Sequence, residues 1–207
     1  NVSTVIVVTG ASRGIGKAIA LSLAAPDTAL IINCSKSAGR LELVKEEIIK
    51  KGALCETFVG DVSNYSTVNE MFDLAISIYG KVNVLINNAG VASIGLFQDM
   101  TPDMWNNIMS VNLNSVYNCC HFAVQDMLRR HCGKIINISS VWGLYGASCE
   151  VAYSATKGAI NSFTKALAKE LAPSNIQVNA IACGAIDTEM NGHLSPEELQ
   201  ELAEEIP

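Results

Sequence analysis

Short runs of β-branched and apolar residues alternate with segments of helical periodicity along almost the whole chain, and this alternation limits the fold more than any other feature. The first run, 2–9, is apolar nearly throughout, as in a strand buried on both faces of a parallel sheet. Alternating strands and helices require right-handed crossovers, which predicts an α/β fold with a doubly wound parallel sheet and helices on both faces. Strands are predicted at 2–9, 28–34, 54–60, 82–86, 134–139 and 176–182, and helices at 14–25, 41–51, 66–79, 102–130 and 151–171.

The length and composition of the chain favour one compact unit. A chain of 207 residues can build one substantial core but hardly two, and neither a linker of low complexity nor an internal repeat divides the sequence. Because 49% of the residues are hydrophobic and only 16% are charged, a disordered chain is excluded. We therefore expect a single domain over residues 1–207, with its substrate site inside that domain.

Several classes of partner are disfavoured. The formal net charge of −6 and the lack of a basic run argue against nucleic acid. The apolar runs are far shorter than the roughly 20 residues of a membrane helix, and the N-terminus has no secretory pattern, so we expect a cytoplasmic protein with no membrane partner. Seven cysteines at irregular spacing, without a CxxC pair, favour neither a disulfide framework nor a metal site.

A glycine-rich turn, TGASRGIG at 9–16, follows the first predicted strand and opens the first predicted helix. Glycines in such a turn let a phosphate approach the backbone N–H groups at a helix N-terminus. The same letters could form an ordinary strand-to-helix turn. Their place between a strand and a helix favours binding of a dinucleotide pyrophosphate.

Tyr153 and Lys157 lie four residues apart in a predicted helix, so their side chains share one face. A phenol has an ordinary pKa near 10, and a neighbouring ammonium shifts that pKa toward neutrality, as proton transfer near neutral pH requires. A surface YxxxK pair is common by chance. The pair therefore gains weight only from other motifs at the same place.

Two further motifs follow predicted strands: ISS at 138–140 and NNAG at 87–90. Ligands of open α/β sheets gather beyond the carboxyl ends of the strands, where a serine hydroxyl can reach a substrate carbonyl. Either motif alone could be a plain turn. Together with the glycine-rich turn and the Tyr153–Lys157 pair, they predict one active site at one edge of the sheet.

These motifs jointly resemble the short-chain dehydrogenase/reductase family. TGASRGIG, NNAG, VNL at 111–113, ISS, YSATK at 153–157 and NAIACGAIDT at 179–188 occur in the family's order and spacing, over almost the whole chain. The resemblance implies a Rossmann-type fold and a homotetrameric oxidoreductase that transfers hydride from a nicotinamide and needs no metal. It also implies one more strand and helix, so the C-terminal strand is expected to be missing from this chain. Cys183-Gly184 replaces the family's Pro-Gly, which should loosen the turn beside the nicotinamide.

The resemblance also implies roles for individual residues. Tyr153 would be the general acid in reduction, and Lys157 would lower its pKa and hold the nicotinamide ribose. Ser140, rather than Ser139, would polarise the substrate carbonyl, and Asn112 would hold a water that connects the lysine to solvent. Further cofactor contacts are expected from Gly10, Ser12, Arg13 and Ile15 at the pyrophosphate and adenosine ribose, Asp61 and Val62 at the adenine, Asn88 and Gly90 at the adenosine side of the cleft, and Ile186 and Thr188 at the nicotinamide carboxamide.

The residues after the second predicted strand favour NADP(H) over NAD(H). A carboxylate there would bind the ribose 2′-hydroxyl and repel a 2′-phosphate. The chain instead reads Asn33, Cys34, Ser35 and Lys36. Arg13 and Lys36 offer positive charge to a phosphate, with Ser35 beside them.

Within the family, GKIINISSV, YSATKGAINSFTKALAKELA and GAIDTEM most resemble the 3-oxoacyl-[acyl-carrier-protein] reductases of fatty acid biosynthesis. This resemblance implies NADPH-dependent reduction of a 3-oxoacyl thioester to the 3-hydroxyacyl form, with Arg129 and Arg130 as basic candidates for carrier-protein docking near the cleft. The alternatives are reduction of a ketone on modified elongation factor P, on a sugar or on a steroid, or a nucleotide-binding regulator without catalysis. A regulator has no chemical reason to keep Asn112, Ser140, Tyr153 and Lys157 together.

Overall fold

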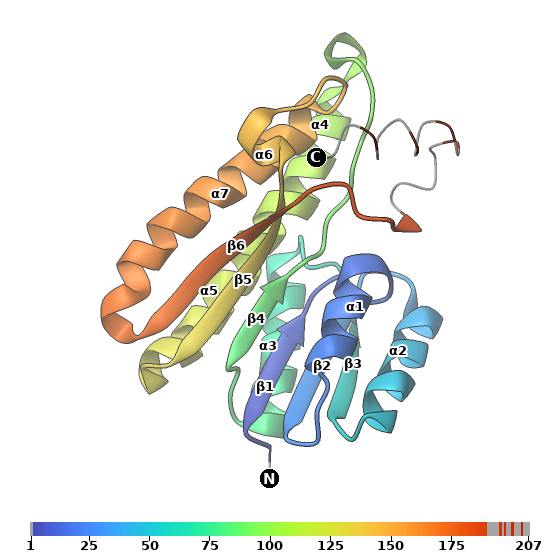
Figure 1. Ribbon diagram of the computed structural model, residues 1–207. Helices are drawn as coiled ribbons and strands as arrows, with labels where there is room; N and C mark the ends of the chain where they lie inside the picture. The colour runs from blue at the N-terminus through green and yellow to red at the C-terminus, as the bar shows by residue number, and fades with distance from the viewer. Residues whose placement is uncertain (1, 190–194, 196, 198–199, 201–203, 205–207) are drawn as a thin grey trace.

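The protein forms a six-stranded parallel sheet in the order β3-β2-β1-β4-β5-β6 (Figure 1). The computed structural model describes residues 2–189, 195, 197, 200 and 204. Strand order reverses between β1 and β4, which opens a crevice at the carboxyl ends of the strands. The strands are β1 (Thr4–Val8), β2 (Thr28–Cys34), β3 (Leu54–Val59), β4 (Val84–Asn87), β5 (Gly133–Ser140) and β6 (Ile176–Cys183).

Helices lie on both faces of this sheet. α1 (Gly14–Leu23) and α2 (Ala38–Lys50) pack in front of it in Figure 1, and α3 (Tyr65–Tyr79), α5 (Ser115–Arg130) and α7 (Val151–Leu171) pack behind. Every residue of the β-branched strand β2 is buried between the two layers. The predicted doubly wound α/β fold is confirmed.

The front layer is narrower than the back layer. Among residues 2–189, α1 and α2 cover β1, β2 and β3, but no helix covers β5 and β6 on that side. Ile181 of β6 is consequently 52% exposed. An apolar groove therefore runs along the sheet beside α1.

The helix predicted at 102–130 contains one irregular turn. α4 (Pro102–Met109) and α5 are joined by the π-helical turn η2 (Ser110–Asn114), which buries Asn112 completely. π turns accommodate one extra residue and occur often at functional sites. The predicted helix is present, and the turn brings the Asn112 side chain into the interior of the protein.

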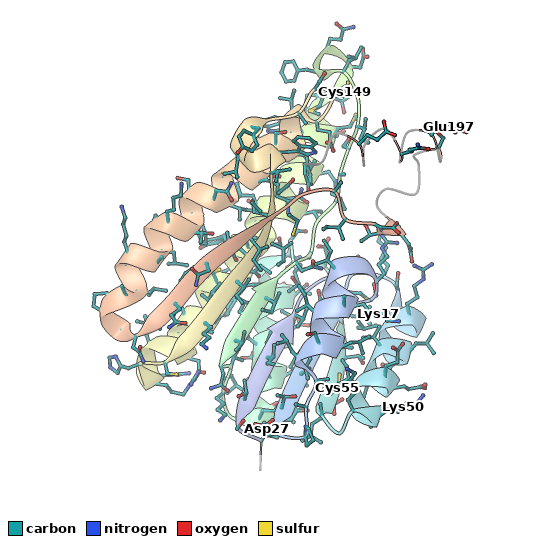
Figure 2. The ribbon with its side chains drawn as sticks, viewed as in Figure 1. Lys17, Asp27, Lys50, Cys55, Cys149 and Glu197 are labelled. Atoms are coloured by element: carbon teal, nitrogen blue, oxygen red, sulfur yellow. The ribbon has the colours of Figure 1, made fainter. Side chains whose placement is uncertain are left out.

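The amino ends of the parallel strands form one edge of the sheet and their carboxyl ends form the opposite edge, and the two carry different groups. Asp27 lies at the amino edge, where it accepts a 2.6 Å hydrogen bond from Ser3, and Cys149 lies at the carboxyl edge, just before α7 (Figure 2). Lys17 of α1 pairs with Glu47 of α2 at 2.9 Å and joins the two front helices. The shorter elements η1 (Phe97–Asp99) and α6 (Trp142–Tyr145) also follow strands at the carboxyl edge, whereas η3 (Ala172–Ser174) precedes β6.

Among the described residues, no helix is both long enough and apolar enough to cross a membrane.

Candidate active site

The glycine-rich turn and the NNAG segment are bonded to each other at the carboxyl ends of β1 and β4. Asn88 donates from Nδ2 to the carbonyl oxygens of Thr9 and Gly10, at 3.1 and 3.0 Å. The Thr9 hydroxyl in turn accepts the N–H groups of Asn88 and Ala89, each at 3.0 Å. Asn88 thus holds the turn through two of its carbonyl groups. Thr9, whose hydroxyl completes this contact, was not among the residues predicted from the sequence.

Two glycines of the turn are required by close approach. Gly10 has a φ of +64°, and a Cβ added to it would lie 2.9 Å from the Ala89 Cα. A Cβ on Gly16, at the start of α1, would collide with the Gly10 carbonyl and the Asn88 side chain. The turn therefore keeps α1 close to β1 and β4.

Tyr153 and Lys157 project from the first turns of α7 toward the end of β5. The Lys157 ammonium donates from Nζ to the Ile138 carbonyl at 2.8 Å and lies 5.5 Å from the centre of the Tyr153 ring. The Ser140 side chain, at the end of β5, lies near enough to the Tyr153 phenol to act on its pKa. Ser139 points instead at α7, where its hydroxyl donates to the Lys157 carbonyl. The structure thus brings three of the predicted catalytic side chains together and leaves Ser139 out.

Burial governs the protonation of both groups. Burial lowers the pKa of Lys157 to about 8, because the interior disfavours the ammonium. Burial also raises the pKa of Tyr153, against the opposing effect of the Ser140 side chain. The phenol therefore holds its proton at neutral pH.

Asn112 connects the cleft wall to α7. Its Oδ1 accepts the N–H of Val91 at 2.8 Å, and its Nδ2 donates to the Val91 carbonyl at 2.9 Å and to the Thr156 hydroxyl at 3.3 Å. A Cβ on Gly90 would lie 3.4 Å from Asn112 Oδ1 and 3.8 Å from Lys157 Nζ. Asn112, Gly90 and Lys157 are therefore neighbours, and the side chain of Asn112 fixes the backbone that follows NNAG.

α6 approaches α7 unusually closely at the level of Lys157. A Cβ on Gly143 would lie 2.6 Å from the Lys157 carbonyl carbon and 2.8 Å from the Gly158 nitrogen. The approach is thus possible only with glycine at 143. Sequence reasoning missed Gly143 and Thr156, because a helix–helix contact of this kind leaves no spacing signal between distant segments.

The predicted adenosine contacts lie at the ends of β2 and β3. Ser35 and Lys36 are exposed directly after β2, whereas Asp61 is exposed and Val62 is buried after β3. Buried Asn33 donates from Nδ2 to the Phe58 and Gly60 carbonyls and joins these two strand ends. The four predicted residues are therefore on the same edge as the glycine-rich turn.

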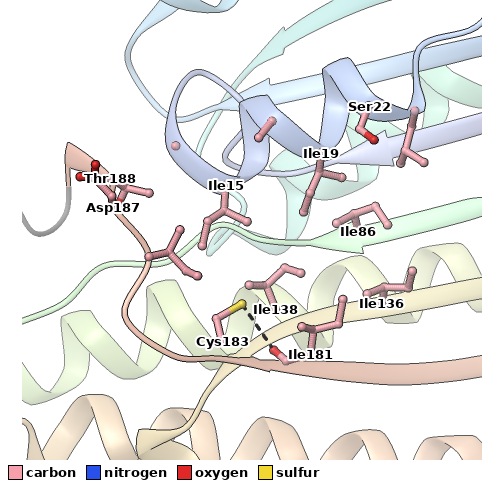
Figure 3. A pocket seen from close by; sticks show the side chains of 14 residues that line it. Ile15, Ile19, Ser22, Ile86, Ile136, Ile138, Ile181, Cys183, Asp187 and Thr188 are labelled. Carbon is pink, nitrogen blue, oxygen red and sulfur yellow. Dashed lines mark hydrogen bonds between the residues drawn. The ribbon is translucent and has the colours of Figure 1, made fainter. Parts of the chain in front are cut away.

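The predicted nicotinamide contacts border the apolar groove beside α1. This groove has a volume of about 610 Å³ and extends from Ile15, Ile186 and Thr188 down the uncovered face of β5 and β6. Figure 3 shows Ile15 and Ile19 of α1 across the groove from Ile138 and Ile181 of the sheet. A Cβ on Gly14 would lie 3.6 Å from Thr188, so the segment after β6 packs on the glycine-rich turn.

Cys183 does not end β6 early. It pairs with Ser140 in the parallel register of β5 and β6, and its carbonyl accepts the Val141 N–H at 2.9 Å. The strand is one residue longer than predicted. The half-buried thiol lines the groove near Ile138, and all seven cysteines of the chain are free thiols.

Arg129 and Arg130 do not border the cleft in this chain, so their predicted position is wrong. α5 runs antiparallel to the strands, and its last turn lies at the amino edge, where Arg130 donates to the Val82 carbonyl ahead of β4. Both guanidinium groups pair with Asp126, at 3.5 Å for Arg129 and 2.8 Å for Arg130.

The carboxyl edge fits a dinucleotide. The glycines keep the backbone of the turn open to close approach by a phosphate, α1 begins at that turn, and Arg13, its N-cap residue, makes no side-chain cap hydrogen bond. Tyr153, Ser140 and Lys157 stand at the far end of the same edge. Within the described residues, no group of three or more His, Cys, Asp or Glu side chains could hold a metal ion.

Known proteins with this arrangement are numerous. A family model described as short chain dehydrogenase matches residues 4–199. 3-oxoacyl-[acyl-carrier-protein] reductase FabG of Staphylococcus epidermidis is 38% identical over 97% of this chain and 82% of its own length, and that of Staphylococcus aureus is 39% identical over 97% and 81%.

Solved structures agree in fold. The crystal structure of a protein described as a short-chain alcohol dehydrogenase of Sinorhizobium meliloti has a TM-score of 0.91 and 31% identity, covering 97% of this chain and 80% of that one. An NAD⁺-bound xylitol dehydrogenase has a TM-score of 0.84 and 32% identity, covering 88% and 70%. The matched residues, the fold and the identities together place the chain in the short-chain dehydrogenase family, a family of oxidoreductases that bind nicotinamide dinucleotides.

Proposed function

We propose that this protein uses NADPH to reduce a ketone to a secondary alcohol, and that its substrate is a 3-oxoacyl group carried as a thioester on acyl carrier protein. The observation that carries the proposal is the position of the Lys157 ammonium, which is held by the Ile138 carbonyl at 2.8 Å and lies 5.5 Å from the centre of the Tyr153 ring, with Ser140 at the end of the same strand. A phenol that can donate a proton and a serine hydroxyl in the same part of the cleft suit a reaction in which a carbonyl oxygen gains a proton. The bound dinucleotide supplies the hydride that reaches the carbonyl carbon.

Each residue has a distinct part in this proposal. Ser140 orients the ketone oxygen, and Tyr153 donates the phenolic proton to it. Lys157 provides positive charge beside the phenol and holds the ribose. Asn112 keeps the Val91 backbone and Thr156 in place. We also assign to it a water that connects Lys157 to solvent, through which a proton returns to Tyr153.

The preference for NADPH rests on the residues beside the adenosine ribose. β2 is followed by Ser35 and Lys36 rather than by an acid, and Arg13 extends into solvent from the glycine-rich turn. A 2′-phosphate is favoured by such cations and disfavoured by a carboxylate after β2.

The thioester substrate is supported by the names of the relatives, which describe 3-oxoacyl-[acyl-carrier-protein] reductases at 38% and 39% identity over 97% of this chain. The proposal treats residues 1–207 as one domain with the substrate site inside it. Assembly as a cytoplasmic homotetramer belongs to the same proposal and rests on the family resemblance alone.

Turnover of a substrate panel tests the proposal. Oxidation of NADPH is followed with an acetoacetyl thioester, a keto sugar and a ketosteroid, each also with NADH. We expect the highest kcat/KM for the thioester with NADPH. Highest turnover of the keto sugar with NADH would replace the proposal by a polyol dehydrogenase, the activity named for the similar xylitol enzyme. Binding of NADPH without turnover of any ketone would support the alternative that the protein is a nucleotide-binding regulator without catalysis.

A further inference from the structure

Three charged side chains from distant parts of the chain meet in front of the glycine-rich turn. Arg13 precedes α1, Arg40 lies in the first turn of α2, and Glu189 follows β6. One oxygen of Glu189, Oε2, lies 2.8 Å from Arg40 Nη1 and 3.5 Å from Arg13 Nη1. Two guanidinium groups therefore converge on a single oxyanion.

A phosphate group has the same requirements as this carboxylate oxygen. Guanidinium groups bind phosphate and carboxylate oxygens with the same planar array of N–H donors. Arg40 follows Lys36 by four residues, so it extends the predicted 2′-phosphate contacts from the end of β2 into α2. The Glu189 carboxylate thus marks a position at which the protein already binds an oxyanion.

We propose that Arg13 and Arg40 together bind the 2′-phosphate of NADP, and that Glu189 competes with this phosphate for the two arginines. Arg40 is then a further determinant of cofactor choice, and Glu189 reduces the preference for NADP. The inference rests on the dinucleotide-binding role proposed above.

Charge makes the two occupants mutually exclusive. The two arginines carry a charge of +2, which a 2′-phosphate alone can neutralise. If Glu189 stayed between them, two anions would face each other at the distance of a hydrogen bond, which is unfavourable. NADH has no 2′-phosphate, so its binding leaves Glu189 in place.

The competition also reaches the other end of the cofactor. Glu189 directly follows Thr188, which packs on Gly14, and Ile186 borders the groove two residues earlier. Displacement of Glu189 by a phosphate would release the segment that the sequence assigns to the nicotinamide. Arg40 holds the pKa of Glu189 below its ordinary value through their hydrogen bond, so the carboxylate is charged at neutral pH.

Direct binding to the full chain tests the competition without turnover. Dissociation constants of NADPH, NADH, 2′,5′-ADP and 5′-AMP are measured at low ionic strength for the wild type, Glu189→Gln, Arg40→Met and the double variant. Glu47→Gln is the matched control, because it removes the same charge from an α1–α2 ion pair that lies apart from the arginines. Thermal unfolding of each variant verifies that it is folded.

We expect Glu189→Gln to tighten NADPH and 2′,5′-ADP by about 3- to 10-fold, as loss of exposed ion pairs permits, and to leave NADH and 5′-AMP within about twofold. Arg40→Met should weaken NADPH by about the same factor. The double variant should bind NADPH somewhat more tightly than Arg40→Met, because Arg13 is then also freed from Glu189. About 0.5 M salt should remove most of the difference. Glu47→Gln should bind all four ligands like the wild type.

Unchanged or weaker NADPH binding in Glu189→Gln, or an equal gain in Glu47→Gln, would overturn the inference. Failure of the proposed function has a different signature. A wild type that prefers NADH, with a Glu189→Gln variant that gains only for the 2′-phosphorylated ligands, keeps the inference and refutes the NADP assignment. A wild type that prefers NADPH, with no effect of either variant, would refute the inference and keep the NADP assignment.

Discussion

The Lys157 ammonium donates a 2.8 Å hydrogen bond to the Ile138 carbonyl, two residues before Ser140, so the end of β5 and the first turns of α7 are held together by a buried charge. That contact positions the lysine beside Tyr153. It also has an energetic cost, because an ammonium is withdrawn from water at this point.

The stability of the fold should depend on the protonation of Lys157. Its pKa is about 8 in the folded chain against an ordinary 10.5, so between these values the folded state binds fewer protons and the contribution to stability rises with pH. Below about pH 8 the burial costs about 3 kcal/mol. Lys157→Met should therefore be more stable than the wild type at pH 7, and the gap should close toward pH 10. Denaturant unfolding at several pH values measures this difference in unfolding free energy, and Lys165→Met, at an exposed position, is the control.

Removal of the phenolic hydroxyl should separate chemistry from binding. Tyr153→Phe should lose about 10²- to 10⁴-fold in kcat, the usual contribution of a positioned acid, with an unchanged dissociation constant for NADPH. Because burial raises the pKa of Tyr153, the kcat for reduction in the wild type should be level through neutral pH and fall only in alkali. Stopped-flow measurement of NADPH oxidation gives kcat and its pH dependence, and a binding titration gives the dissociation constant of NADPH. Unchanged turnover in Tyr153→Phe would assign the proton to another group.

Asn112 and Asn118 offer a matched pair on successive helical turns. Asn112 holds Val91 beside Lys157, whereas Asn118 donates to the Val62 and Ser63 carbonyls at the predicted adenine site. Each change to alanine leaves buried or partly buried backbone groups without their side-chain partner and should cost about 1–3 kcal/mol of unfolding free energy. Asn112→Ala should lower kcat, and Asn118→Ala should chiefly raise KM for NADPH. Equal effects of both variants on kcat would contradict a role of Asn112 in catalysis beyond its contribution to stability.

Gly143 tests the close approach of α6 to α7. Gly143→Ala places a methyl group against the Lys157 carbonyl carbon, so α6 must move away and the unfolding midpoint and kcat should both fall. Gly39→Ala in the first turn of α2 is the control, because nothing lies within 4 Å of an added Cβ there, and it should not lower the unfolding midpoint or kcat. A Gly143→Ala variant with full kcat and an unchanged midpoint would contradict the argument.

The fold could be predicted because each strand is a β-branched run and each long helix an apolar period. Parallel topology then places the residues after every strand on one edge, which explains why Gly10, Ser35 and Ser140 could be assigned to one site. One helix start was predicted late: α2 begins at Ala38, three residues before the start of its apolar pattern.

Relationships between distant segments could not be predicted. The Arg40–Glu189 bond spans 149 residues, and the approach of Gly143 to Lys157 depends on packing alone. The position of Arg129 depends on the direction of α5, and charge alone does not reveal that direction.

The π turn at Ser110–Asn114 sets the rotational phase of everything in α5. Each residue of an α-helix turns the chain by about 100°. Because the π turn already absorbs one extra residue, a one-residue deletion within it would close it as a regular α-helical turn. The buried row Cys119, Ala123 and Met127 would stay on the sheet, but the bulge that carries Asn112 inward would be lost. A one-residue deletion in the regular part of α5 would instead rotate the residues before it by about 100° relative to those after it. Segment length in α5 is thus as strict a requirement as side-chain identity, and the π turn is the one place in 102–130 where a single residue can be lost without turning the helix.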